Sequence, residues 1–145
     1  MTTFDSDPIL ELTEYEAWAK LASVTLGRLA TSVAGQPEIF PVNFVVQRHT
    51  IVLRTAEGTK LLSALINQCV AFEADDHDVY EGWSVIVKGQ ARVLDDATDI
   101  AEAERAQVMP WIPTVKRRFL RITPSAISGR RFRFGGEPDD WSDPS

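Results

Sequence analysis

The sequence contains little that could hold a fold together by covalent or metal bonds. One cysteine among 145 residues excludes an internal disulfide and a cysteine-based zinc site. The two histidines, His49 and His77, are too few for a histidine-rich cluster, so no metal site is expected. The chain also lacks both an uncharged apolar run of about 18 residues and a basic-then-apolar leader. We therefore expect a cytoplasmic protein with no membrane contact.

Basic character is also scarce. The net charge of −6 and the pI of about 4.9 argue against nonspecific binding to nucleic acid, which is not expected as a partner. Seven of the fifteen cations gather between residues 116 and 133. We expect this stretch to be a strand edge that pairs with the chain's own carboxylates.

The apolar pattern predicts a mainly β protein with peripheral helices. Thr13 and Glu16 have capping-box spacing, and the following residues give one apolar helix face (Ala17, Trp18, Leu21, Ala22). Further helices are expected over 59–68 and from Asp95-Asp96 to about Val108. Strands are predicted at 24–33, 38–46, 51–53, 69–73 and 82–94 and, in two parts, at 117–122 and 127–134.

The longest predicted strand has the clearest alternation. One face collects Trp83, Val85, Val87, Ala91 and Val93, and the polar residues fall on the other face. About six strands joined by tight turns must close into a barrel, or pair with a partner, to remove their exposed edges. We expect a leader over 1–12, one β-barrel domain over 13–134 and an acidic tail over 135–145.

The segment Arg54-Thr55-Ala56-Glu57-Gly58-Thr59-Lys60 is the most informative for function. It leaves a predicted strand and enters a predicted helix, where free backbone N–H groups and the helix dipole favour an anion. A cation such as Lys60 opposes that dipole, which makes sense if a phosphate binds between Arg54, Lys60 and the threonine hydroxyls. Alternatively, both cations simply pair with Glu57. Familiar catalytic sets are absent, and the catalytic residues stay unknown.

These segments carry a family resemblance. Gly27-Arg28-Leu29-Ala30, Pro41-Val42-Asn43-Phe44-Val45-Val46, the segment ending at Lys60, and Gly82 to Gly89 follow one another in order. Together they resemble the pyridoxamine 5′-phosphate oxidase-like family. The resemblance implies a six-stranded split β-barrel that is dimeric, with FMN, or in some branches F420, in a cleft between the subunits.

The resemblance also implies roles for particular residues. The ribityl phosphate would lie at Arg54, Thr55, Thr59 and Lys60. The isoalloxazine would be lined by Pro41, Val42, Asn43 and Phe44, with Trp83 near the ring or the dimer seam.

The implied activity is FMN-dependent oxidoreduction. Hydride would pass between a reduced nicotinamide or other donor and an unknown small organic substrate. Alternatives are an F420-dependent reductase and a flavin-binding protein without turnover. The chain is shorter than true pyridoxamine phosphate oxidases, and their C-terminal substrate-binding segment is not recognisable in it, so vitamin B6 is not the expected substrate.

Lys60→Ala tests the phosphate assignment. Because a charged hydrogen bond is lost, FMN binding should weaken by about 1–3 kcal/mol, measured by titration with FMN. Unchanged affinity would place the phosphate elsewhere.

Overall fold

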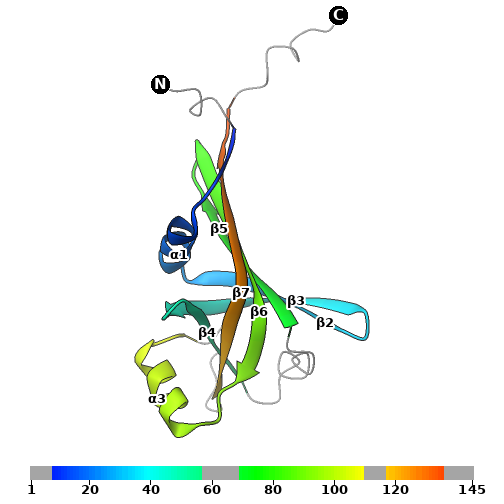
Figure 1. The fold of residues 1–145 in the computed structure, drawn as a ribbon, viewed down its shortest axis with the longest axis vertical. Helices are drawn as coiled ribbons and strands as arrows, with labels where there is room; N and C mark the ends of the chain where they lie inside the picture. The colour runs from blue at the N-terminus through cyan, green and yellow to red at the C-terminus, as the bar shows by residue number, and fades with distance from the viewer. Residues whose placement is uncertain (1–7, 57–68, 110–116, 136–145) are drawn as a thin grey trace, which may run out of the picture.

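The computed structural model describes residues 8–56, 69–109 and 117–135, and these form seven strands and two helices (Figure 1). The predicted helix over 59–68 lies outside the described residues. No helix within these ranges is long and apolar enough to cross a membrane. The elements are β1 (Ile9–Glu11), α1 (Glu14–Ala22), β2 (Leu26–Val33), β3 (Gln36–Gln47), β4 (Thr50–Ala56), β5 (Cys69–His77), β6 (Glu81–Val93), α3 (Ala97–Arg105) and β7 (Arg117–Arg133).

All strand pairings are antiparallel, and the sheet has the order β1-β7-β4-β3-β2-β5-β6. In addition, β6 pairs with β7, so the hydrogen-bonded order from β7 through β4, β3, β2, β5 and β6 returns to β7. Six strands are therefore linked in a closed sequence, and β1 is added at one edge of β7. The prediction of a mainly β protein with peripheral helices is confirmed.

Helix α1 begins as predicted. The Thr13 hydroxyl accepts from the backbone N–H of Glu16 at 3.1 Å, and the Glu16 carboxylate accepts from the backbone N–H of Thr13 at 2.8 Å. Each interaction satisfies a donor that a helix start leaves open. Trp18 and Leu21 are buried as expected, whereas Ala22, at the last turn, is exposed.

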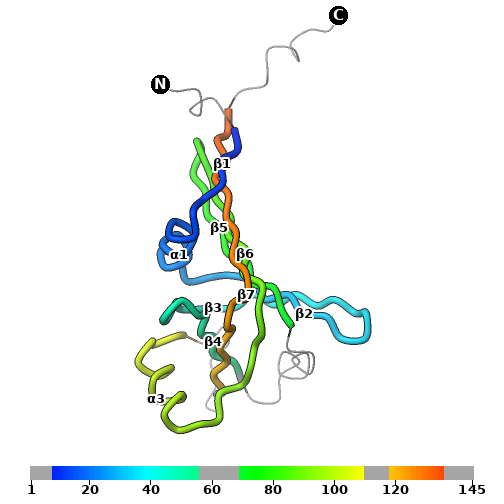
Figure 2. Tube along the Cα trace, viewed as in Figure 1, coloured from blue at the N-terminus to red at the C-terminus, as the bar shows by residue number. Residues whose placement is uncertain are grey.

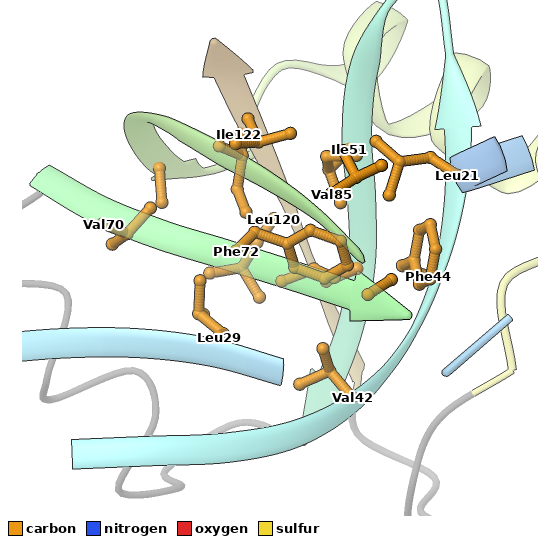
Figure 3. Close-up of a cluster of buried hydrophobic side chains, with 14 of the residues drawn as sticks. Leu21, Leu29, Val42, Phe44, Ile51, Val70, Phe72, Val85, Leu120 and Ile122 are labelled. Carbon is orange, nitrogen blue, oxygen red and sulfur yellow. The ribbon is translucent and has the colours of Figure 1, made fainter. Parts of the chain in front are cut away.

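The core lies between the strands and is capped on one side by α1. Phe44 and Phe72 meet edge to face with ring centroids 4.7 Å apart, and Leu21 reaches the same cluster from α1 (Figure 3). On β6, Val85, Val87 and Ala91 are fully buried and Trp83 nearly so, while Val93 is partly buried. The predicted alternation of this strand is confirmed.

The C-terminal strand differs from its prediction. The two strands expected at 117–122 and 127–134 form one strand, β7. The sequence Thr123-Pro124-Ser125 predicts a break in the strand. The structure has instead a shift in the register with β6, since Gly89 faces Pro124 and Lys88 faces Ala126. Ser125 is thus an extra residue in a bulge, and its hydroxyl donates to the Lys88 carbonyl at 3.1 Å. A bulge accommodates proline, so the ladder resumes beyond it.

Other boundaries also moved. Three residues of the expected leader form β1, in which Ile9 faces Phe132 and Glu11 faces Arg130. The strand predicted at 69–73 is longer, because residues 74–77 continue β5 and pair with β6. Helix α3 has the expected cap at Asp96 but ends at Arg105, since Gln107 adopts a positive φ of 57° that stops the helix. Figure 2 shows α3 at the end of the molecule opposite β1.

Gly89→Ala should destabilise the fold, because a Cβ at this position would lie 2.2 Å from the Thr123 carbonyl oxygen and 2.9 Å from the Pro124 Cα. Both atoms belong to the backbone of β7, which cannot move aside cheaply. We expect the free energy of unfolding in urea to fall by about 1–3 kcal/mol. Gly135→Ala is the control, since nothing in the described part of the chain lies within 4 Å of its Cβ. Equal stability of the two variants would contradict the close approach.

Candidate functional site

The candidate site lies where β3 changes its hydrogen-bonding partner. The ladder between β3 and β4 runs from Gln47 facing Thr50 to Phe44 facing Leu53. Towards its start, β3 pairs with β2 instead, so that Asn43 faces Leu26. Beyond Leu53, β4 continues along β7, where Arg54 faces Phe119. The two predicted binding segments, 41–44 and 54–55, therefore flank the point at which these strands take different partners.

Within the first segment, the strand alternation divides the predicted residues. Val42 and Phe44 are buried in the core, with Phe44 only 1% exposed. Asn43 is half-buried and Pro41 is exposed, on the opposite face of the strand. The side chains that face outward from this segment are those of Pro41 and Asn43, whereas the Phe44 ring meets Phe72 edge to face in the core.

In the second segment, Arg54 is held in a defined position. Its Nη1 donates to the Val108 carbonyl at 3.1 Å, and its Cζ lies 5.4 Å from the centroid of the Phe119 ring. The ring contact has the geometry of a cation–π interaction. Thr55 follows, half-buried and opposite Arg118 on β7. Thr59 and Lys60, the other predicted phosphate ligands, lie outside the described residues.

Trp83 is not brought to Arg54 within one chain. Trp83 faces Arg131 on β7, whereas Arg54 faces Phe119 on the same strand. Twelve residues of strand separate the two positions, which corresponds to roughly 40 Å at 3.3 Å per residue. Trp83 is 9% exposed, belongs to the main core and lies 5.9 Å from Lys20 Nζ.

A cluster that the sequence analysis missed lies across the neighbouring strands. Arg28 on β2 faces Pro41 on one side and Glu73 of β5 on the other. Its Nη2 contacts the Asp75 carboxylate at 3.2 and 3.4 Å, while its Nε lies 3.6 Å from Glu73 Oε1. The alternation Phe72-Glu73-Ala74-Asp75 is the signal that could have placed both carboxylates on one face.

The Glu73 carboxyl in this cluster has a strongly raised pKa. Burial, a hydrogen bond with Asp75 and the negative charge of Asp75 raise its pKa to about 7, and the charge of Arg28 opposes the rise. The distances explain why Arg28 does not prevail, since its guanidinium is closer to Asp75 than to Glu73. Among the described residues, Glu73 Oε1 is buried with no hydrogen-bond partner. The protonatable carboxyl of Glu73 on β5 is therefore separated from Pro41 on β3 by the single strand β2.

The family is shown by comparison with known proteins. Residues 13–131 match the pyridoxamine 5′-phosphate oxidase family, and this span is most of the chain. The chain therefore belongs to the pyridoxamine 5′-phosphate oxidase-like family, which confirms the resemblance found in the sequence.

The chain is also similar to solved structures and to a relative of known sequence. The chain resembles an FAD binding protein from Mycobacterium smegmatis at 56% identity and a TM-score of 0.80, covering 87% of this chain and all of that one. It resembles a putative pyridoxamine 5′-phosphate oxidase from Corynebacterium glutamicum at 39% identity and a TM-score of 0.81, covering 90% and 98%. An uncharacterized protein of Mycobacterium tuberculosis is 58% identical over 95 residues, which cover 66% of this chain and 86% of that protein.

Glu73→Gln should change how stability depends on pH. Because the carboxyl has a pKa of about 7 in the folded protein against an ordinary value of 4.5, the folded state binds the proton more tightly. Its stabilising contribution is complete below about pH 4.5 and is lost as the pH rises through about 7. The variant, which mimics the neutral form, should gain stability relative to the wild type between pH 5 and pH 8.

Urea unfolding at both pH values measures this difference. Glu104→Gln removes one negative charge from an exposed position on α3 and controls for net charge. A stability difference between Glu73→Gln and wild type that stays constant across this range would show that Glu73 is ionised throughout.

Proposed function

We propose that this chain binds a flavin nucleotide whose phosphate is held at the end of β4. The observation that carries the proposal is the Arg54 guanidinium, fixed by the Val108 carbonyl and the Phe119 ring beside the point where β3 and β4 take different partners. Arginine in a fixed orientation is well suited to bind a phosphate through two hydrogen bonds. The family and the Mycobacterium smegmatis relative, described as an FAD binding protein, support a flavin as the ligand.

Residues on both segments would hold this ligand. Arg54 and Thr55 would bind the phosphate, together with Thr59 and Lys60. Pro41 and Asn43 present their side chains outward on the adjoining segment of β3, where the ring system would lie. The buried Val42 and Phe44 would shape this face from below by packing rather than by touching the ring.

A homodimer is part of this proposal. The closed order of six strands is the arrangement expected of a split β-barrel subunit. Leu26, Ile39 and Ile86 are exposed by 40%, 67% and 40%, and strand alternation puts them on the outer face with Pro41 and Asn43. A second copy of the chain would cover these apolar side chains. A dimer would also explain how Trp83 could lie near the ring or the dimer seam, although it is too far from Arg54 to share a site within one chain.

The bound flavin would supply hydride transfer between a reduced nicotinamide or other donor and a small organic substrate. The chain's own residues would bind and orient the cofactor and keep water from its covered face. FMN is the first candidate because it is the smallest flavin with the required phosphate. FAD and F420 are the competing ligands, and binding without turnover is the competing function.

The absorbance spectrum of the purified protein, followed by titration with FMN, FAD and F420, tests the proposal. We expect flavin absorbance or tight uptake of an added flavin, a dimeric mass in solution, and oxidation of NADH or NADPH that depends on the flavin. Failure to take up any of the three cofactors would refute the proposed function. Uptake without oxidation of either nicotinamide would leave a binding protein in its place.

Arg54→Gln should weaken the binding of FMN by about 1.5–3 kcal/mol, because the phosphate loses its fixed cation. This is the range for a hydrogen bond to a charged group. Riboflavin, which has no phosphate, should bind wild type and variant alike. Fluorescence titration of both ligands measures this. Equal losses for FMN and riboflavin would mean that Arg54 supports the ring or the fold and not the phosphate.

A further inference from the structure

Arg121 is a buried cation that the proposed site does not use. Arg121 is 7% exposed and lies near the start of β7. Its Nη2 donates to Gln47 Oε1 at 2.7 Å and lies 3.1 Å from Glu102 Oε1. Burying such a pair gives little stability compared with apolar packing of the same size, because both charges lose their water. What the pair does provide is a fixed direction and a fixed distance.

The network fixes helix α3 to the strands. Glu102 belongs to α3, and its second oxygen, Oε2, lies 2.9 Å from Arg48 Nη1 in the turn after β3. Gln47 also donates from Nε2 to the Glu102 backbone carbonyl at 2.9 Å. Both the side chain and the backbone of Glu102 are therefore held by residues of β3, β7 and the β3–β4 turn. These contacts set where α3 lies and how it is rotated about its axis.

Helix α3 in turn leads to the contacts of Arg54. Three residues after the helix ends, Val108 is fully buried, and its carbonyl accepts from Arg54. Ala103 of α3 and Val108 belong to the same apolar cluster as Phe119, whose ring lies against the Arg54 guanidinium. Both groups contact Arg54 from positions set by α3, the helix that Glu102 anchors. The Phe119 ring packs in the same apolar cluster as α3, and Val108 follows the helix in the chain.

We propose that Glu102, Arg121 and Gln47 form a positioning network that sets the orientation of Arg54 through α3, and thereby the affinity for the flavin phosphate. This inference rests on the proposed function. None of the three residues touches the ligand. The network acts by keeping the Val108 carbonyl and the Phe119 ring where they direct the guanidinium toward the strand end.

Glu102→Gln tests the network, with FMN and riboflavin titrated by fluorescence against the full-length protein. We expect FMN affinity to fall about three- to tenfold, the effect of losing roughly one oriented hydrogen bond, with riboflavin affinity unchanged. Asp99→Asn is the matched control. Asp99 lies on the same helix and pairs with Arg92 at 3.3 Å on its exposed side, so its loss should leave both affinities unchanged. Gln47→Ala, which breaks two hydrogen bonds of the network without leaving a charge unpaired on α3, should repeat the selective loss.

The outcomes separate the two proposals. Wild type that binds FMN no better than riboflavin would refute the phosphate site and this inference with it. Wild type that prefers FMN, with a preference that Glu102→Gln and Gln47→Ala leave intact, would refute only the network. A variant that loses FMN and riboflavin equally would also refute it, since the network would then support the fold and not Arg54.

Discussion

Continuous hydrogen bonding along β7 is the constraint on which the rest of the structure depends. From Leu120 to Ile122 this strand is paired on both sides, with β4 and with β6, and further along it pairs with β6 and β1. A break in β7 would leave buried backbone donors and acceptors of three other strands without partners, which is costly. The bulge at Ser125 lets the ladder pass Pro124 without such a break.

The closure that β7 provides also explains where the candidate site lies. β4 pairs with β7 from Ile51 to Ala56, whereas its pairing with β3 ends at Leu53, so its last residues run along β7 alone. The first part of β3 pairs with β2 instead. A cation and two outward side chains are thereby placed on neighbouring segments with different partners. The described part of the site is thus a consequence of how the strand order closes.

Sequence alone predicted the features that depend on neighbouring residues. The capping box at Thr13 and Glu16 and the alternation of β6 are encoded within a few positions, and both are confirmed. The two-part prediction for β7 was wrong because Pro124 signals a break, whereas β7 accommodates it through a bulge at Ser125. Strand β1 is too short to show a pattern and exists only because β7 offers an edge.

The candidate site divides in the same way. Segment 54–55 was predicted from its residue types and segment 41–44 from the family resemblance, but which of Val42, Asn43 and Phe44 face outward depends on the strand's register in the core. The contacts of Arg121 could not be predicted, since Gln47 lies 74 positions away in the sequence. Pairings over such distances are decided by topology, for which a local pattern has no signal.

Helices α1 and α3 are attached to the strands by different kinds of interaction. Trp18 and Leu21 attach α1 through apolar contacts, which are strong but have no preferred direction. Helix α3 has a smaller apolar contact, to which charged and amide hydrogen bonds from Gln47, Arg48 and Arg121 are added. Hydrogen bonds are lost by small rotations that apolar packing tolerates. A helix whose next residues orient Arg54 needs such directional contacts, whereas a helix that only covers the core does not.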